Sequence, residues 1–207
     1  MTVQRPRDAK RSRQLILDVA EVEFSAKGIH GARVDEIAAK AGLNKRMIYQ
    51  YFDSKEGLYK AVLVEVYGRL SRLETALLEK DAPVVDRLRD LIRLYFEFLH
   101  GNPTYVNLIL WENLNQARYL REVDIRASKS PVYRRIRDLF EEGRTDGSFR
   151  ADLDADQTLL SLLTYTFSYF SNRYTLSTLL ESDLDDEARL QARIGSVTDM
   201  FLCYLGS

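Results

Sequence analysis

The chain has 207 residues, 45% of them hydrophobic, which is enough to bury a substantial core in one large or two small domains. Its net charge of −1 argues against a protein that binds any polyanion through bulk charge, and its single cysteine, Cys203, excludes an internal disulfide. No signal peptide is visible, and the longest uncharged stretch, 157–172, is shorter than the roughly 20 apolar residues of a membrane-spanning helix. We therefore expect a cytoplasmic protein with no membrane role.

The N-terminal part of the chain is basic. Residues 1–60 carry a net charge of +4, and residues 61–207 carry −5. Five basic side chains are expected to precede the first helix as an arm: Arg5, Arg7, Lys10, Arg11 and Arg13. Such an arm can enter a minor groove or hold phosphates, although a solvated tail has the same composition.

A first amphipathic helix is predicted by Ile16, Ala20 and Phe24, which recur at helical spacing and share one apolar face. We expect this helix to end at Gly28, because glycine is the residue most often found just past a helix end. The helix would support the motif that follows it.

Residues 34–52, VDEIAAKAGLNKRMIYQYF, contain two short helical patterns joined by a glycine break, which is typical of a helix-turn-helix. Val34, Ile37 and Ala41 lie on the apolar face of the first pattern, and Gly42 supplies the backbone freedom needed to end it. This arrangement predicts DNA binding.

The second pattern has the features of a recognition helix. Asn44 is a favourable N-cap, and Ile48 and Phe52, four residues apart, face inward. The outward set is Lys45, Arg46, Tyr49 and Gln50. Lys and Arg can donate to guanine, and Gln can pair with adenine, so we expect this face to read bases. Phosphate contacts are expected from Tyr49, Tyr51 and Lys55.

With their flanks, residues 13–63 resemble the DNA-binding domain of the TetR family of bacterial repressors. The resemblance rests on residues that follow the family's order and spacing: Ala20, Phe24, Gly28, Ile37, Ala38, Ala41, Gly42, Tyr49, Phe52, Lys55 and Leu58. It implies a helix-turn-helix domain over residues 1–55 that binds double-stranded operator DNA, followed by a ligand-binding and dimerisation domain over 56–207.

Three positions depart from the family pattern, so an operator sequence cannot be copied from other members. Arg33 replaces the Ser or Thr that usually caps the second helix and contacts phosphate, Arg46 replaces a small residue, and Met47 replaces a residue that commonly carries a hydroxyl. Arg33 is still expected to reach a phosphate. Arg46 could read guanine or only add a backbone contact.

Beyond residue 60 the apolar residues follow a helical period throughout, and no strand is expected. A long connector helix is predicted from Leu58 to Leu77, and Pro83 breaks the chain after it. Further helices are expected over 88–99, 104–114, 131–142, 156–180 and 185–204. The predicted fold is all-α, with a three-helix DNA-binding domain, a helical C-terminal domain and about nine helices in total.

Near-heptad spacing makes one stripe the expected dimer interface: Leu190, Ile194, Val197 and Phe201. The same stripe would also serve the core of a monomeric bundle. The family resemblance favours a homodimer, because many members pair two C-terminal helices from each subunit and a twofold dimer matches a palindromic operator.

Aromatic residues concentrate beyond residue 60, near uncharged polar groups, which is typical of an apolar pocket with a few orienting hydrogen bonds. The candidate lining residues for a small-molecule effector are Tyr95, Phe98, Trp111, Glu112, Asn115, Tyr165 and Tyr169. Aromatic residues at helical spacing also form ordinary cores, so both roles stay open for these positions.

Catalysis is not expected. His30 and His100 are the only histidines, and neither belongs to a nucleophile–base pattern. The acids from Asp152 to Asp156 imitate the opening of a calcium loop but lack its glycine and final glutamate, so no metal or cofactor is expected. The favoured function is a ligand-responsive transcriptional repressor. The alternative is a helical carrier or enzyme that retains a helix-turn-helix domain.

Overall fold

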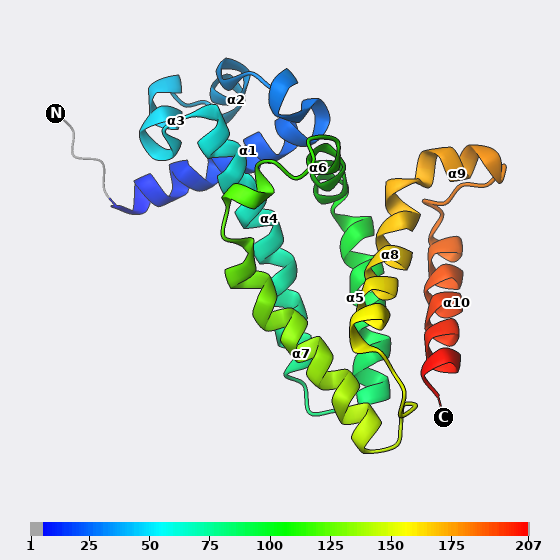
Figure 1. Cartoon of the computed structure of the whole chain (residues 1–207). Coiled ribbons are helices and arrows are strands. Elements are labelled where there is room, and N and C mark those ends of the chain that lie inside the picture. The colour runs from blue at the N-terminus through cyan, green and yellow to red at the C-terminus, as the bar shows by residue number, and fades with distance from the viewer. Residues whose placement is uncertain (1–5, 207) are drawn as a thin grey trace. The chain divides into compact units, whose positions relative to one another are not determined.

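Every regular element of the computed structural model, which describes residues 6–206, is helical (Figure 1). The described chain contains ten α-helices and one short 3₁₀ helix, close to the about nine helices expected. The all-α prediction is confirmed. None of the described helices is both long enough and apolar enough to cross a membrane.

Two compact units make up the chain. The N-terminal unit contains residues up to Tyr67 together with Asn107–Ile125, and the C-terminal unit contains Gly68–Val106 and the residues from Arg126 onward. Three helices contribute residues to both units: α4 (Lys55–Leu78), α6 (Pro103–Leu114) and α7 (Ile125–Thr145), the last of these with Ile125 alone in the N-terminal unit. The division expected from the sequence, after residue 55, assigns Asn107–Ile125 to the second domain, whereas in the structure these residues pack within the first unit.

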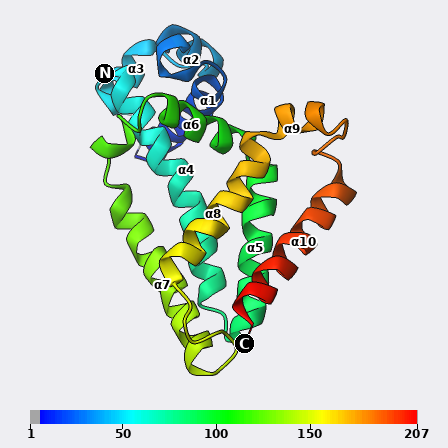
Figure 2. The same ribbon diagram turned by 45° about the vertical axis from the view of Figure 1, so that its right-hand side comes forward.

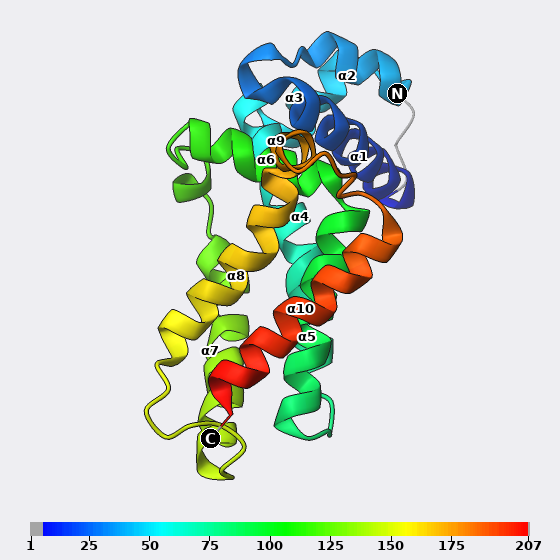
Figure 3. The same cartoon turned by 90° about the vertical axis from the view of Figure 1, so that its right-hand side faces the viewer.

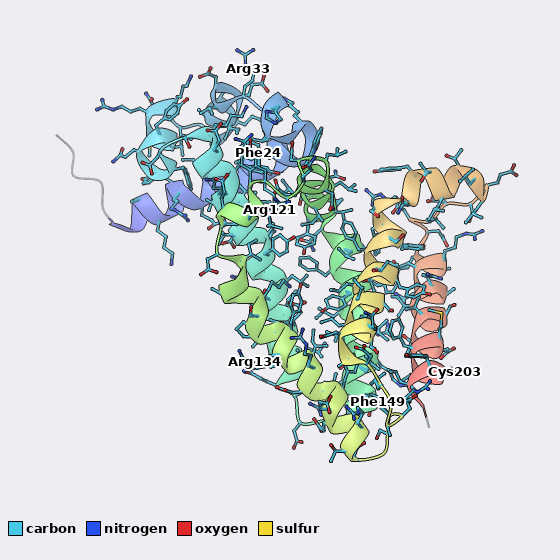
Figure 4. All side chains as sticks on the ribbon, viewed as in Figure 1. Phe24, Arg33, Arg121, Arg134, Phe149 and Cys203 are labelled. Carbon is cyan, nitrogen blue, oxygen red and sulfur yellow. The ribbon has the colours of Figure 1, made fainter. Side chains whose placement is uncertain are left out.

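The N-terminal unit is built on three helices and the start of α4. The three are α1 (Pro6–Gly31), α2 (Val34–Ala41) and α3 (Lys45–Phe52), and α1 packs against both of the others. Ile16, Ile37 and Ile48 are fully buried where these helices meet. Phe24, labelled in Figure 4, meets the ring of Tyr59 on α4 edge to face at 5.0 Å.

α1 differs from the expected first helix at both ends. It begins at Pro6, so Arg7, Lys10, Arg11 and Arg13 belong to the helix and the prediction of an arm is wrong for them, while Arg5 lies outside the described residues. Proline is favourable at the first helical position, and Lys and Arg are good helix formers, so α1 can begin at Pro6. At the other end, Gly28 adopts φ 63° and ψ 174°, after which one more helical turn reaches Gly31.

The C-terminal unit is a set of long helices. They are α5 (Val84–Gly101), α7 (Ile125–Thr145), α8 (Ala155–Ser171), α9 (Arg173–Leu179) and α10 (Glu187–Leu205). Both α8 and α10 pack on α5, and Figure 2 shows both helices inclined to it. One ion pair joins α7 to α4, Lys129 to Glu74 at 2.6 Å, and a second joins α7 to the turn after α4, Arg135 to Glu79 at 2.5 Å.

Two helix boundaries differ from the expectation. The helix expected to start at Pro131 begins at Ile125 and includes that proline in its second turn. The helix expected over 156–180 is divided at Asn172 into α8 and α9. Residues 125–130, IRASKS, are too polar to show an apolar period, and near Asn172 the apolar period runs on into α9, so periodicity alone could locate neither boundary.

Candidate nucleic-acid interface

The turn between α2 and α3 is fixed by two local caps. Gly42 adopts φ 63°, and its N–H donates to the carbonyl of Ala39 at 3.1 Å, which ends α2. The side chain of Asn44 accepts the N–H of Arg46 at 2.8 Å, which begins α3. A left-handed glycine and an Asn N-cap are the residues that such a short turn favours.

α3 buries one face and exposes the other. Ile48 and Phe52 are buried against the rest of the N-terminal unit. The exposed residues at the start and outer face of the helix are Asn44, Lys45, Arg46, Tyr49 and Gln50, and Met47 and Tyr51 are half-buried. The side chains are thus distributed as the spacing predicts, while their contacts with DNA stay a prediction.

Lys45 is held on the exposed face by an acidic neighbour. Its Nζ lies 2.7 Å from Oδ1 of Asp35 on α2, and its ammonium lies 5.9 Å from the centre of the Tyr49 ring. The hydrogen bond to Asp35 raises the pKa of Lys45, so the side chain stays positive. A phosphate or guanine would have to replace Asp35 as the partner of this charge.

Arg33 and Lys55 lie at the starts of α2 and α4. Arg33 occupies the N-cap position of α2 but makes no side-chain cap, and it lies exposed at the outer edge of the N-terminal unit (Figure 4). Lys55 is half-buried, and its Nζ donates to the carbonyl of His30 at 3.4 Å. Ser54 caps α4 by accepting the N–H of Gly57 at 2.9 Å.

Sequence reasoning missed two residues that position this interface. Glu23 of α1 is buried and pairs with Lys27, at 2.9 Å, and with Lys40 of α2. A Cβ atom at Gly57 would lie 2.0 Å from the carbonyl oxygen of Phe52, so only glycine lets α3 and α4 approach this closely. The Glu23–Lys27 spacing is visible in the sequence, but the contact with Lys40 requires the fold.

The seven residues considered for an effector pocket are divided between the two units. Trp111, Glu112 and Asn115 belong to the N-terminal unit. The indole N–H of Trp111 donates to the carbonyl of Ser25 at 3.1 Å, Glu112 is buried and accepts the N–H of Leu120 at 2.9 Å, and Asn115 donates to the Trp111 carbonyl at 2.9 Å. Each of these three polar groups therefore has a structural partner within its own unit.

The other four belong to the C-terminal unit. Tyr95 and Phe98 are buried on α5, with the Tyr95 hydroxyl donating to Glu74 at 2.8 Å and the Phe98 ring 5.2 Å from that of Tyr105. Tyr165 and Tyr169 lie on α8 and line one groove with α9 and α10. Tyr165 and Tyr169 are therefore the two candidates that line a common groove.

The stripe expected at a dimer interface is buried inside the single chain. Leu190, Ile194, Val197 and Phe201 are at most 4% exposed, because α10 packs on α5 through this face. Their spacing therefore reflects the core of their own chain. The large apolar side chains that α8 and α10 leave exposed are Leu160, Tyr165, Met200 and Tyr204.

A helix-turn-helix with an exposed basic and polar second helix defines a class, the DNA-binding proteins that place this helix in the major groove. Known sequences refine the assignment. The profile described as "Bacterial regulatory proteins, tetR family" matches residues 16–62, and "Tetracyclin repressor-like, C-terminal domain" matches residues 84–201. The chain belongs to the TetR family of bacterial transcriptional regulators, as the resemblance of residues 13–63 predicted.

Individual relatives and structures agree with this assignment. The chain is 32% identical over 199 residues to the HTH-type transcriptional repressor NicS of Pseudomonas putida, covering 96% of this chain and 94% of that protein. It resembles the fatty acid degradation regulator FadR of Bacillus halodurans, with a TM-score of 0.73, 21% identity and 97% of each chain covered. FadR of Bacillus subtilis in complex with stearoyl-CoA gives a TM-score of 0.68 at 19% identity, covering 93% of this chain and 98% of that one.

Proposed function

We propose that this protein is a transcriptional repressor that binds a palindromic operator as a homodimer and is released from it by a small molecule. The single observation that carries the DNA-binding part is the exposed face of α3, where Lys45, Arg46, Tyr49 and Gln50 surround the buried anchors Ile48 and Phe52. The similarity to NicS, which is named a repressor, supports the direction of regulation.

Different residues of this interface are proposed to contact the bases and the phosphates. Base reading comes mainly from the N-terminal part of a recognition helix, where Lys45 and Arg46 lie. Tyr49 and Lys55 are assigned to phosphates, because a phenolic hydroxyl and an ammonium at a helix start suit that contact. Arg33, Asn44, Met47, Gln50 and Tyr51 complete the proposed DNA-facing set.

Fluorescence anisotropy with the protein's own promoter fragment, at several salt concentrations, tests this assignment. Lys45→Ala or Arg46→Ala should weaken the cognate site by about 1–3 kcal/mol if that residue reads a base. Lys55→Ala should instead weaken all sequences alike and lower the salt slope by about one. Folded variants that all retain wild-type operator affinity would refute the site. A carrier that only retains the motif would show no binding above the nonspecific background.

The dimer is proposed through α8 and α10, on the exposed residues Leu160, Met200 and Tyr204. A twofold dimer would place its two recognition helices about 34–36 Å apart, one turn of DNA. Met200→Glu should yield monomers in sedimentation that bind operator poorly, because a carboxylate would enter the apolar interface. Arg134→Glu, on the exposed surface of α7 (Figure 4), is the control and should stay dimeric. An unchanged dimer in Met200→Glu would place the interface elsewhere.

The effector is proposed to bind the C-terminal unit. The Bacillus subtilis FadR structure, which contains stearoyl-CoA, supports a ligand in proteins of this fold. α4 contributes to both units and begins beside Lys55, so a shift of this helix is the proposed link between effector and DNA. Coupling of about 1–3 kcal/mol would lower operator affinity roughly 5- to 150-fold and would lower effector affinity by the same factor in the presence of operator. Equal affinities with and without operator would show that the two sites are uncoupled.

A further inference from the structure

The C-terminal unit contains an open groove bounded by α8, α9 and α10. Its volume is about 630 Å³, and Figure 3 shows the side of the unit on which α8 and α10 face the viewer. The residues that define its character are Tyr165, Tyr169, Leu176, Leu180, Arg189 and Arg193. Small-molecule sites typically have volumes of about 300–1,000 Å³, so the groove has room for one.

Two arginines of α10 form the charged side of the groove. Arg189 and Arg193 are four residues apart and therefore share one face of the helix. Neither forms an ion pair with a carboxylate of the described residues, and Nε of Arg193 is buried with no hydrogen-bond partner. A buried donor without an acceptor is unfavourable, and an anion in the groove would supply an acceptor to Arg193 and a charge partner to the exposed Arg189.

The three acids just before α10 have other hydrogen-bond partners, and Oδ1 of Asp186 accepts the backbone N–H of Arg189 at 3.0 Å. Oδ1 of Asp185 lies 3.4 Å from a guanidinium nitrogen of Arg173, and Oδ1 of Asp183 accepts the N–H of Asp185 at 2.9 Å. The hydroxyl of Tyr169 donates to the carbonyl of Leu184 at 2.7 Å. No ion pair joins these acids to Arg189 or Arg193, so within the described residues the two guanidinium groups of the groove have no carboxylate partner.

The opposite wall is apolar and open to solvent. Leu180 is 64% exposed and Tyr165 is 42% exposed, and the neighbouring Leu179 is 77% exposed. Apolar side chains so exposed beside a concave surface are typical of a binding site. An occupant that satisfies both walls needs an anionic head and an apolar body.

We propose that the groove binds a small amphipathic anion, with its carboxylate or equivalent head on Arg189 and Arg193 and its apolar part along Leu176, Leu180 and Tyr165. The claim that this anion is the effector rests on the function proposed above. The claim that the groove binds the anion does not depend on DNA binding. The concave shape and the two unpaired guanidinium groups favour such a molecule over a flat protein partner.

Calorimetry of the full-length protein with decanoate, and with the uncharged 1-decanol of equal length, tests the proposal. Decanoate should bind once per chain, at least tenfold more tightly than decanol. Arg193→Gln should weaken decanoate about tenfold or more and leave decanol unchanged, and the double variant Arg189→Gln/Arg193→Gln should weaken it further. Leu180→Glu, at an exposed position, should weaken decanoate by charge repulsion without disturbing the fold.

Arg144→Gln is the matched control. It removes the same charge from the same unit, but Arg144 pairs with Glu141 at 2.9 Å on the surface of α7, so decanoate binding should not change. Absence of decanoate binding, equal affinities for decanoate and decanol, or equal effects of Arg144→Gln and Arg193→Gln would overturn the proposal. So would a change from dimer to monomer in Arg193→Gln without decanoate binding, because the groove would then receive a partner subunit. Operator binding, measured separately, reports on the proposed function.

Discussion

The indole ring of Trp111 occupies the space that a side chain at residue 28 would need. An ideal Cβ built on Gly28 lies 2.8 Å from Cδ2 of Trp111, and the indole N–H donates to the carbonyl of Ser25 one turn earlier in α1. Through Trp111, α6 is thus attached to α1 at the point where α1 is interrupted, with Gly28 at φ 63° and ψ 174°.

Gly28→Ala should destabilise the N-terminal unit strongly. A backbone conformation that only glycine adopts readily costs of order 1–3 kcal/mol in other residues, and displacement of Trp111 adds to this cost. Thermal unfolding and operator binding measure the effect. Gly195→Ala is the control, because a Cβ there meets nothing within 4 Å inside α10, and it should stabilise by about 0.5–1 kcal/mol. Equal melting temperatures of Gly28→Ala and the wild type would contradict the packing described.

Arg33 offers a test that separates stability from DNA contact. Arg33→Ser supplies the cap that α2 lacks and should be about 1 kcal/mol more stable than Arg33→Ala. Both variants lose the guanidinium, so both should show the same reduction in DNA affinity if Arg33 contacts a phosphate. Denaturant unfolding measures the stability of the two variants, and fluorescence anisotropy measures their DNA affinity. A Ser variant no more stable than the Ala variant would contradict the cap.

Glu23 should make the N-terminal unit sensitive to acid. Hydrogen bonds from Lys40 and Lys27 lower the pKa of Glu23 below its ordinary 4.5. Because the folded-state pKa is the lower one, this stabilisation is present above the unfolded pKa and is lost as pH falls through the folded value. Urea unfolding of the wild type from about pH 7 to about pH 3 should therefore show a decline that Glu23→Gln reduces. Parallel pH curves for the two proteins would be the contrary result.

The buried ion pair of the C-terminal unit should be costly to break from one side. Glu74 and Lys129 are 0% and 5% exposed, and burial lowers the pKa of Lys129 while the Glu74 charge opposes that shift. Lys129→Met leaves a buried carboxylate and should cost about 3–5 kcal/mol, whereas Glu74→Gln/Lys129→Met should recover much of this loss because Gln still accepts from Tyr95. The control is Arg135→Met, which breaks the exposed pair with Glu79 and should cost about 0–1 kcal/mol. A double variant as unstable as Lys129→Met would contradict this account.

The helix-turn-helix could be predicted from the sequence because its determinants are local. Gly42 ends one helix and Asn44 begins the next through hydrogen bonds that span only a few residues. Ile48 and Phe52 face inward because four residues make about one helical turn. The same local logic predicted α4 and the absence of strands among the described residues.

The tertiary structure decided which surfaces those helices bury and where contacts distant in sequence form. The period of Leu190, Ile194, Val197 and Phe201 shows that one face of α10 is buried, but it cannot distinguish α5 of the same chain from a second subunit. Trp111 reaches the Ser25 carbonyl across 86 positions, and Arg189 and Arg193 line a groove only because α8, α9 and α10 surround it. Periodicity and capping depend on residues within a turn or two of each other, so a single sequence shows them. The pairing of helix faces depends on shape and charge complementarity between segments far apart in the chain. A single sequence does not show which of these segments will meet.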